Sequence, residues 1–200
     1  MKDKWYGDNR DLIKWGTLLE LASRYESKHI LQVLYYRPSE WEQIEIDGTN
    51  AGIAKEVIQH FRNVDSIRNL VCPVAIEVLQ EEFSDRTKYL QAVIGAIQAR
   101  RIRPGIIFLD PDTGLQPPGG KYGPTHVLDS ELGEVWRSLE PLDVLVFYQH
   151  QTNRAGDPWI ESKKSQFAKA IGSQMDQVKH AHAPGWNTAR DVAFFFLAKQ

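Results

Sequence analysis

Two carboxylates two residues apart, Asp110 and Asp112, are the clearest chemical feature of the sequence. They belong to a segment Asp-Pro-Asp-Thr-Gly that directly follows the apolar run Gly105–Leu109. Carboxylates at this spacing can hold a divalent cation, accept a proton or bind an amino group. Pro111 fixes its own φ, and Gly114 permits a left-handed turn. We predict that Asp110 and Asp112 are catalytic; the alternative is a strand-end turn in which Asp112 bonds its own backbone.

A second polar group follows the next apolar run, which covers Asp143–Gln149. His150 can titrate near neutral pH or donate to a phosphate. Arg154 can clamp a phosphate or a carboxylate through two parallel hydrogen bonds. Tyr148 adds an aromatic ring at the end of the same run. We predict a catalytic His150 and substrate-binding Tyr148 and Arg154; the alternative is a solvated loop in which His150 packs against Tyr148.

The loop over residues 116–126 (QPPGGKYGPTH) is rich in glycine and proline. Within it, Tyr122 can stack on a base and Lys121 can meet a phosphate, so we predict that both bind substrate. The spacing of its glycines and lysine differs from that of a Walker phosphate loop. The alternative is a mobile surface loop without a ligand.

The order of apolar runs predicts the elements that position these residues. We expect helices over residues 11–25, 52–63, 84–103, 130–139 and 158–171 and strands over 29–36, 72–79, 105–110, 143–149, 175–183 and 192–198. Residues 41–47 read as an edge strand or a loop, followed by an Asp-Gly turn at 47–48.

Strands that alternate with helices indicate a mainly parallel sheet covered on both faces. The short turn before the last strand indicates an antiparallel C-terminal strand. We therefore predict one three-layer, Rossmann-like α/β domain over residues 1–200. Ligands of such sheets bind beyond the carboxyl ends of the strands. Tyr36 after the first strand and Glu77 near the end of the second are therefore predicted to bind a cofactor, with Glu77 on a ribose.

Composition narrows the function classes. The 200 residues are 42% hydrophobic and 25% charged with a net charge of −2, which excludes a disordered chain and a globally basic nucleic-acid coat protein. A nucleic-acid partner would need a local site, and Lys121, Arg154 and Arg101 are the candidates. The run of residues 100–103 (RRIR) reads as a solvated helix end. The single cysteine indicates a reducing, cytoplasmic location. The sequence contains no stretch of about 18 apolar residues, which is the length that a membrane-spanning helix needs.

The segment Gly7-Asp-Asn-Arg-Asp-Leu-Ile-Lys14 and the pair Asp110-Pro111 resemble motifs of the S-adenosylmethionine-dependent methyltransferases that modify adenine N6 in ribosomal RNA. That family has a parallel sheet closed by an antiparallel final strand. The resemblance implies S-adenosylmethionine as cofactor, with Lys14 near it and a nucleic-acid base as substrate. It also implies that Asp110 accepts the amino hydrogen of the base and that Asp8, Asn9 and Pro111 contact the substrate. The chain is also similar to bacterial and prophage proteins with an Asp-Pro-Asp-x-Gly turn.

Two departures from the family pattern leave other functions open. No glycine follows the first strand, where residues 34–39 read LYYRPS, and Asp112 and Thr113 replace a proline and an aromatic residue. One alternative is a metal-dependent nuclease or phosphoesterase, in which Asp110 and Asp112 hold Mg²⁺ and His150 assists a water. The other is a non-catalytic binding protein on a methyltransferase scaffold. A cavity beside Tyr36 would favour the cofactor, and Asp110→Ala is expected to abolish activity without disturbing the fold.

Overall fold

The computed structural model describes residues 7–38, 42–120, 123–151, 158–183 and 189–200. Its main sheet has six strands in the order β4-β1-β5-β8-β10-β9. β4, β1, β5 and β8 are parallel, whereas β10 is antiparallel to both of its neighbours. The predicted fold class is therefore confirmed. The bounds are His29–Val33 for β1, Ala75–Leu79 for β4, Gly105–Leu109 for β5, Val144–His150 for β8, Lys179–His182 for β9 and Val192–Ala198 for β10.

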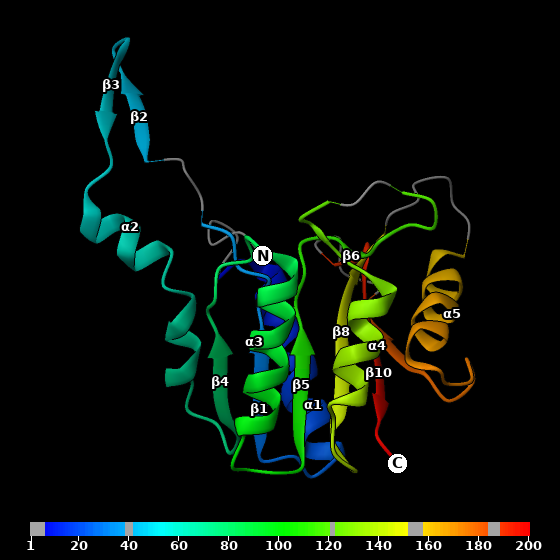
Figure 1. Cartoon of the computed structure of the whole chain (residues 1–200). Coiled ribbons are helices and arrows are strands. Elements are labelled where there is room, and N and C mark those ends of the chain that lie inside the picture. Colours follow the sequence, from blue (N-terminus) through cyan, green and yellow to red (C-terminus); the bar gives the residue numbers. More distant parts are fainter. Residues whose placement is uncertain (1–6, 39–41, 121–122, 152–157, 184–188) are drawn as a thin grey trace.

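Helices cover both faces of this sheet and give it three layers (Figure 1). α1 (Asn9–Arg24) packs on one face through apolar side chains spaced three and four residues apart. α3 (Arg86–Ala99), α4 (Asp129–Arg137) and α5 (Trp159–Ile171) pack on the other. Because both faces are covered, every residue of β1 and β5 is buried. Among the described residues, no helix is long and apolar enough to cross a membrane.

The strand order reverses beside β1, and this places the ligand crevice. The chain leaves β1, returns to the sheet as β4 on one side, and then crosses through α3 to become β5 on the other side. In open α/β sheets, ligands bind at the carboxyl ends of the two strands where such a reversal occurs. The residues that follow β1 and β5 are therefore the first place to look for a site.

An arm of two strands and a helix connects β1 to β4 and projects away from the sheet (Figure 1). β2 (Gln43–Ile46) and β3 (Thr49–Gly52) form an antiparallel hairpin, and α2 (Lys55–Phe61) follows. Asp47 and Gly48 both have positive φ, at 50° and 77°, as the predicted Asp-Gly turn requires. The hairpin pairs with no strand of the main sheet, unlike the edge strand considered from the sequence. A 3-10 helix, η2 (Val64–Asn69), leads from the arm towards β4.

A buried ion pair fixes the sheet at the end where its parallel strands begin, opposite their carboxyl ends. The guanidinium of Arg100 and the carboxylate of Asp143 are both 0% exposed, with Nη1 and Oδ1 3.1 Å apart. Asp143 also accepts hydrogen bonds from the backbone N–H groups of Gly105 and Glu140. The prediction that Arg100 is solvated is therefore wrong. Arg101 lies at this same edge, away from the carboxyl ends where a nucleic acid was expected to bind.

Removing one partner of this pair leaves an uncompensated buried charge. We expect Asp143→Ala to lower the free energy of unfolding by ~3–5 kcal/mol, measured by urea denaturation. The matched control is Glu140→Ala, because the Glu140 carboxylate makes an exposed ion pair with Arg103 at 2.9 Å. That variant should cost at most ~1 kcal/mol. Equal costs for the two variants would contradict this interpretation of the buried pair.

Candidate functional site

A buried polar layer lies between α1 and the carboxyl ends of β1, β5 and β8. Asp110, directly after β5, is 1% exposed. The Lys14 ammonium on α1 lies 3.0 and 3.1 Å from the two carboxylate oxygens of Asp110. Gln32 on β1 donates its side-chain N–H to Asp110 Oδ2 at 3.1 Å. Lys14, which the family resemblance placed near a cofactor, thus binds Asp110 and joins α1 to the sheet.

Two carboxylates keep the Lys14 ammonium charged inside the protein. Asp11, on the same helix, brings an oxygen to 3.2 Å from Nζ. Burial by itself lowers the pKa of Lys14, but Asp110 and Asp11 raise it above its usual value. Burial raises the pKa of Asp11, while the nearby Lys14 opposes that shift. The ring of Tyr148 lies 4.6 Å from the same ammonium.

This burial changes the expectation for Asp110. A carboxylate that is 1% exposed and bound by a lysine anchors α1 to β5 and cannot meet a substrate in this conformation. Removing it would leave the Lys14 ammonium with less compensation, so this geometry leads us to expect that Asp110→Ala also destabilises the fold. Within the described residues, the Gln32 amide oxygen and the Tyr148 hydroxyl have no hydrogen-bond partner, so the layer can still bind a polar atom.

A double-mutant cycle tests the anchoring role. Lys14→Met and Asp110→Leu should each lower the free energy of unfolding by ~3–5 kcal/mol, because each leaves a buried charge behind. The double variant should cost clearly less than the sum of the two. Glu20→Ala is the control, since its exposed pair with Arg24 on α1 is worth only ~0.3–0.5 kcal/mol. Simple additivity in urea denaturation would rule out a direct Lys14–Asp110 interaction.

The turn after Asp110 is fixed to the ends of both neighbouring strands. Asp112 forms an ion pair with Arg37, which follows β1. The buried side chain of Gln149 on β8 accepts from the backbone of Leu115 at 2.8 Å and donates to that of Thr113 at 3.2 Å. Gly114 has a φ of 124°, and a Cβ there would lie 2.3 Å from Gln149. Glycine is therefore required at this position.

These pairs disfavour the metal-dependent hydrolase. Asp110 is bound by Lys14 and Asp112 by Arg37, so each carboxylate already has a cation beside it. A divalent cation placed between the two carboxylates would be repelled by both the Lys14 ammonium and the Arg37 guanidinium. Across the described ranges, no group of three histidine, cysteine, aspartate or glutamate side chains is arranged to hold a metal ion. The residues proposed for Mg²⁺ thus do not fit that role in this arrangement.

His150 ends β8 beside the polar layer. Its Nδ1 lies 3.1 Å from the guanidinium of Arg10, which also bonds both carboxylate oxygens of Asp191. Burial, together with the cations of Arg10 and Lys14, lowers the pKa of His150 to about 4. The ring is therefore neutral at pH 7, and it does not titrate near neutral pH as the sequence suggested.

The lowered pKa of His150 has a consequence for stability. The unfolded chain, with a histidine pKa near 6.5, takes up a proton that the folded chain resists until the pH reaches about 4. The free energy of unfolding should fall as the pH drops from 6.5 to 4, and His150→Gln should make this fall shallower. Thermal unfolding across that range measures it. The effect of His150→Gln is compared with that of His60→Gln, which removes a histidine from the exposed arm.

The structure places four further residues that were predicted to bind substrate. The Asp8 carboxylate caps α1 by accepting from the backbone N–H groups of Arg10 and Asp11. Asn9 is the exposed first residue of α1, and Pro111 is buried after Asp110. Tyr148 packs inside the core with its ring 5.2 Å from that of Phe194. The predictions for Lys121, Tyr122 and Arg154 lie outside the described residues.

Glu77 does not lie at the end of its strand. It occupies the middle of β4, and its carboxylate contacts the His29 ring at 3.1 Å, near the start of β1. The sequence placed it too close to the carboxyl edge, because β4 begins only at Ala75 and runs to Leu79. The polar residues that follow β4 are instead Gln80, Glu81 and Glu82, all exposed. The predicted ribose contact of Glu77 has no support in this geometry.

A cavity of about 520 Å³ opens beside Tyr36, three residues after β1. Tyr35 has a φ of 48°, so the chain takes a glycine-like turn without a glycine. Its ring packs against Phe83 and Tyr89 on the α3 side. The arm and the residues directly before and after it supply most of the wall, which no feature of the sequence indicated. The lining residues are Tyr36, Pro38, Glu42, Ile58, Gln59, Arg62 and Asn63.

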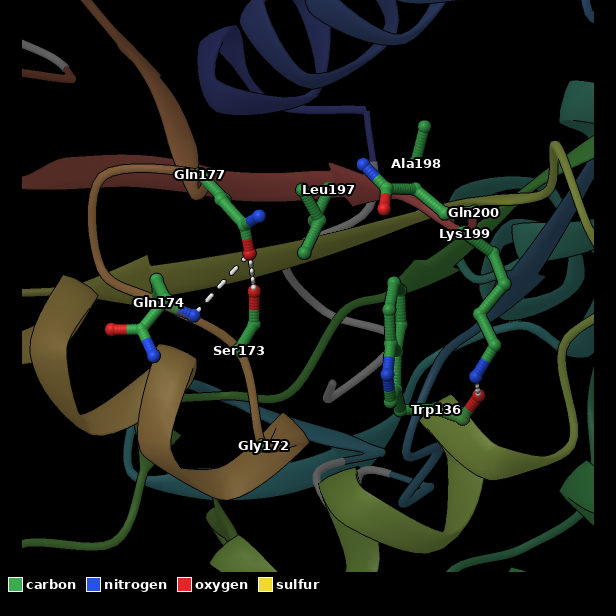
Figure 2. Close-up of a pocket in the computed structure, with 9 residues that line it drawn as sticks. All are labelled: Trp136, Gly172, Ser173, Gln174, Gln177, Leu197, Ala198, Lys199 and Gln200. Atoms are coloured by element: carbon green, nitrogen blue, oxygen red, sulfur yellow. Dashed lines mark hydrogen bonds between the residues drawn. The ribbon is translucent and has the colours of Figure 1, made fainter.

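A second, smaller pocket of about 240 Å³ lies at the opposite edge of the sheet (Figure 2). It is formed by the end of α4, the loop after α5 and the residues around the end of β10. Trp136 forms one wall, and the Lys199 ammonium donates to the Trp136 carbonyl while lying 4.5 Å from its ring. None of the residues predicted to act on a ligand lines this pocket, so a substitution here is a suitable control for substitutions in the cavity beside Tyr36.

Comparison with known proteins identifies no family for this chain. No protein-family model and no curated protein matches the chain. A Thermobifida fusca structure described as a "putative methyltransferase" is 12% identical with a TM-score of 0.46, covering 96% of this chain and 80% of that one. A Klebsiella pneumoniae "putative O-methyltransferase" is 12% identical with a TM-score of 0.39, covering 94% and 80%. The fold assignment rests on the strand order and pairing of this chain, and these similarities carry no argument about its activity.

Proposed function

We propose that this protein is an S-adenosylmethionine-dependent methyltransferase that binds its cofactor in the cavity beside Tyr36. The cavity that opens beyond the carboxyl end of β1, between the residues after that strand and α2, is the observation that supports this most directly. Its volume of about 520 Å³ lies within the usual range for small-molecule sites. The likeness of the segments Gly7–Lys14 and Asp110–Pro111 to methyltransferase motifs adds to the proposal.

The lining of the cavity matches the parts of S-adenosylmethionine. Tyr36 and Ile58 offer aromatic and apolar surface for an adenine ring. Glu42 can accept from ribose hydroxyls or an ammonium, and Arg62 can donate to a carboxylate. Glu42 and Arg62 lie 3.5 Å apart as an ion pair, so each can exchange part of that contact for the ligand. When bound, the cofactor supplies an activated methyl group, and these residues bind and orient it.

The polar layer and the turn after β5 act as positioning elements in this proposal. Arg37 directly follows Tyr36 in the chain, and its pair with Asp112 ties one wall of the cavity to the turn after β5. Lys14 and Gln32 hold the neighbouring Asp110. The ends of β1 and β5 are thereby kept in register, which holds the residues after β1 that line the cavity in place.

For the methyl acceptor, we propose a nucleic-acid base. The motif resemblance supports it, and with a net charge of −2 any contact with the phosphate backbone has to be local. A binding protein that does not transfer a methyl group is the second candidate. The observation that favours it is the burial of Asp110, which leaves the expected catalytic carboxylate without access to a substrate.

Calorimetric titration with S-adenosylmethionine tests the cavity. Tyr36→Ala should weaken binding by about 5- to 150-fold, because stacking a base on an aromatic ring is worth ~1–3 kcal/mol. Gln174→Ala, in the pocket at the opposite edge, is the matched control and should bind as the wild type does. Failure of the wild type to bind, or equal binding by Tyr36→Ala, would refute the assignment of the cavity.

Transfer of a labelled methyl group to total RNA or DNA then separates the two candidates. Label in nucleic acid supports the methyltransferase with a base as acceptor. Cofactor binding without transfer to nucleic acid or to any small-molecule acceptor would support the binding protein. The second measurement adds to the first, because binding requires only the cavity and transfer also requires an acceptor.

A further inference from the structure

We infer that His180 and His182 form a binding site for a divalent transition metal that prefers imidazole ligands, such as Zn²⁺ or Cu²⁺. The two residues are two positions apart on β9, so their side chains project from the same face of that strand. Their ring centroids lie 5.6 Å apart, with an angle of 32° between the ring planes. The inference is independent of the proposed function, because three other strands separate β9 from β1, where the cavity opens.

The separation of the two rings fits the coordination of one ion. Zinc binds imidazole nitrogens at about 2.0–2.1 Å and prefers tetrahedral angles, which places the centroids of two bound rings roughly 5 Å apart. The separation of 5.6 Å between the His180 and His182 rings is close to this value. Side chains exposed to solvent rotate freely on a fast timescale, so a small rotation of either ring brings both to the same ion.

The sheet presents this pair of histidines on a fixed backbone. His180 and His182 lie opposite Phe195 and Ala193 of β10, and these two β10 residues are buried in the core on the α5 side. Residues opposite one another in antiparallel strands project from the same face, so the histidines lie on the α5 side as well. β9 is the edge strand of the sheet, and both histidines remain exposed there. A ladder that already holds both residues reduces the entropy lost when an ion binds.

The charged groups around the pair are compatible with a bound cation. Partial burial lowers the pKa of His180, as do His182 and the Lys164 ammonium on α5, whereas the Glu161 carboxylate on α5 raises it. A neutral imidazole is the form that offers a nitrogen lone pair to a metal, and a lowered pKa keeps the His180 ring in that form at pH 7. Glu161 and Lys164 carry opposite charges, so together they neither strongly attract nor strongly repel an ion at this place.

Two protein ligands leave the remaining coordination positions open. In the part of the chain that the structure describes, no third histidine, cysteine, aspartate or glutamate is arranged to complete a metal site. Structural zinc sites have four protein ligands, so the ion at this pair is exchangeable and water completes its coordination. Magnesium prefers oxygen ligands in octahedral geometry, so it is not expected to bind here.

The test is calorimetric titration of the EDTA-treated, dialysed protein with ZnCl₂, CuCl₂ and MgCl₂ in turn. We expect one Zn²⁺ or Cu²⁺ per chain, tighter binding of Cu²⁺ than of Zn²⁺, and no binding of Mg²⁺. His180→Gln and His182→Gln should each weaken Zn²⁺ binding by about 100-fold, because the second imidazole meets an ion that the first already holds close to it. His60→Gln is the matched control, since His60 is an exposed histidine on α2 whose ring contacts Phe61, and it should bind as the wild type does.

Zinc should also raise the melting temperature of the wild type and of His60→Gln, but not that of the two β9 variants. Equal binding by all four proteins would show an adventitious ion only and would overturn the inference, and so would a wild type that binds neither Zn²⁺ nor Cu²⁺. Glutamine keeps an exposed polar side chain on β9, and circular dichroism of each variant verifies that the sheet is intact. Since no S-adenosylmethionine is added, failure here is distinct from failure of the proposed function.

Discussion

The buried ion pair between Lys14 and Asp110 is the constraint on which the carboxyl edge of the sheet depends. An ammonium and a carboxylate taken out of water are costly unless each is closely paired. Asp11 and Gln32 complete the pairing, and together they join α1, β1 and β5 at one point. The same contacts keep Asp110 away from solvent, so this carboxylate positions the site and does not face a ligand.

A second ion pair holds the other end of the same central strand. Arg100 and Asp143 are inaccessible to solvent, and Asp143 also binds the backbone N–H of Gly105, where β5 begins. β5 is thus fixed at its start through Asp143 and at its end through Asp110. With both ends fixed, the turn that follows β5 has a defined place against Arg37 and Gln149. A rigid scaffold of this kind leaves the variable part of the site to the connections between strands.

The connection between β1 and β4 is that variable part. It provides one wall of the cavity through α2 and the residues around it, yet β2, β3 and α2 contain no buried residue. A wall that is weakly attached to its own domain can be held by a ligand inside the cavity.

The sequence by itself determined the order of elements and the class of fold. Apolar periodicity located α1 and β10 to within about two residues, because a face buried against a core imposes that spacing directly. The turn residues Asp47, Gly48 and Gly114 were recognisable because positive φ restricts which residues fit. The sequence also identified the ends of β5 and β8 as polar, which is where the polar layer forms.

Only the tertiary structure decided which of these polar residues meet. Lys14 and Asp110 are 96 positions apart, and nothing local to either residue reveals the pairing. The same holds for Arg100 and Asp143, where a run of basic residues looked like a solvated helix end. Glu77 was misplaced because an apolar run does not show where hydrogen bonding begins. The cavity beside Tyr36 depends on how the arm returns to the sheet, which is set by long-range packing and not by local preference.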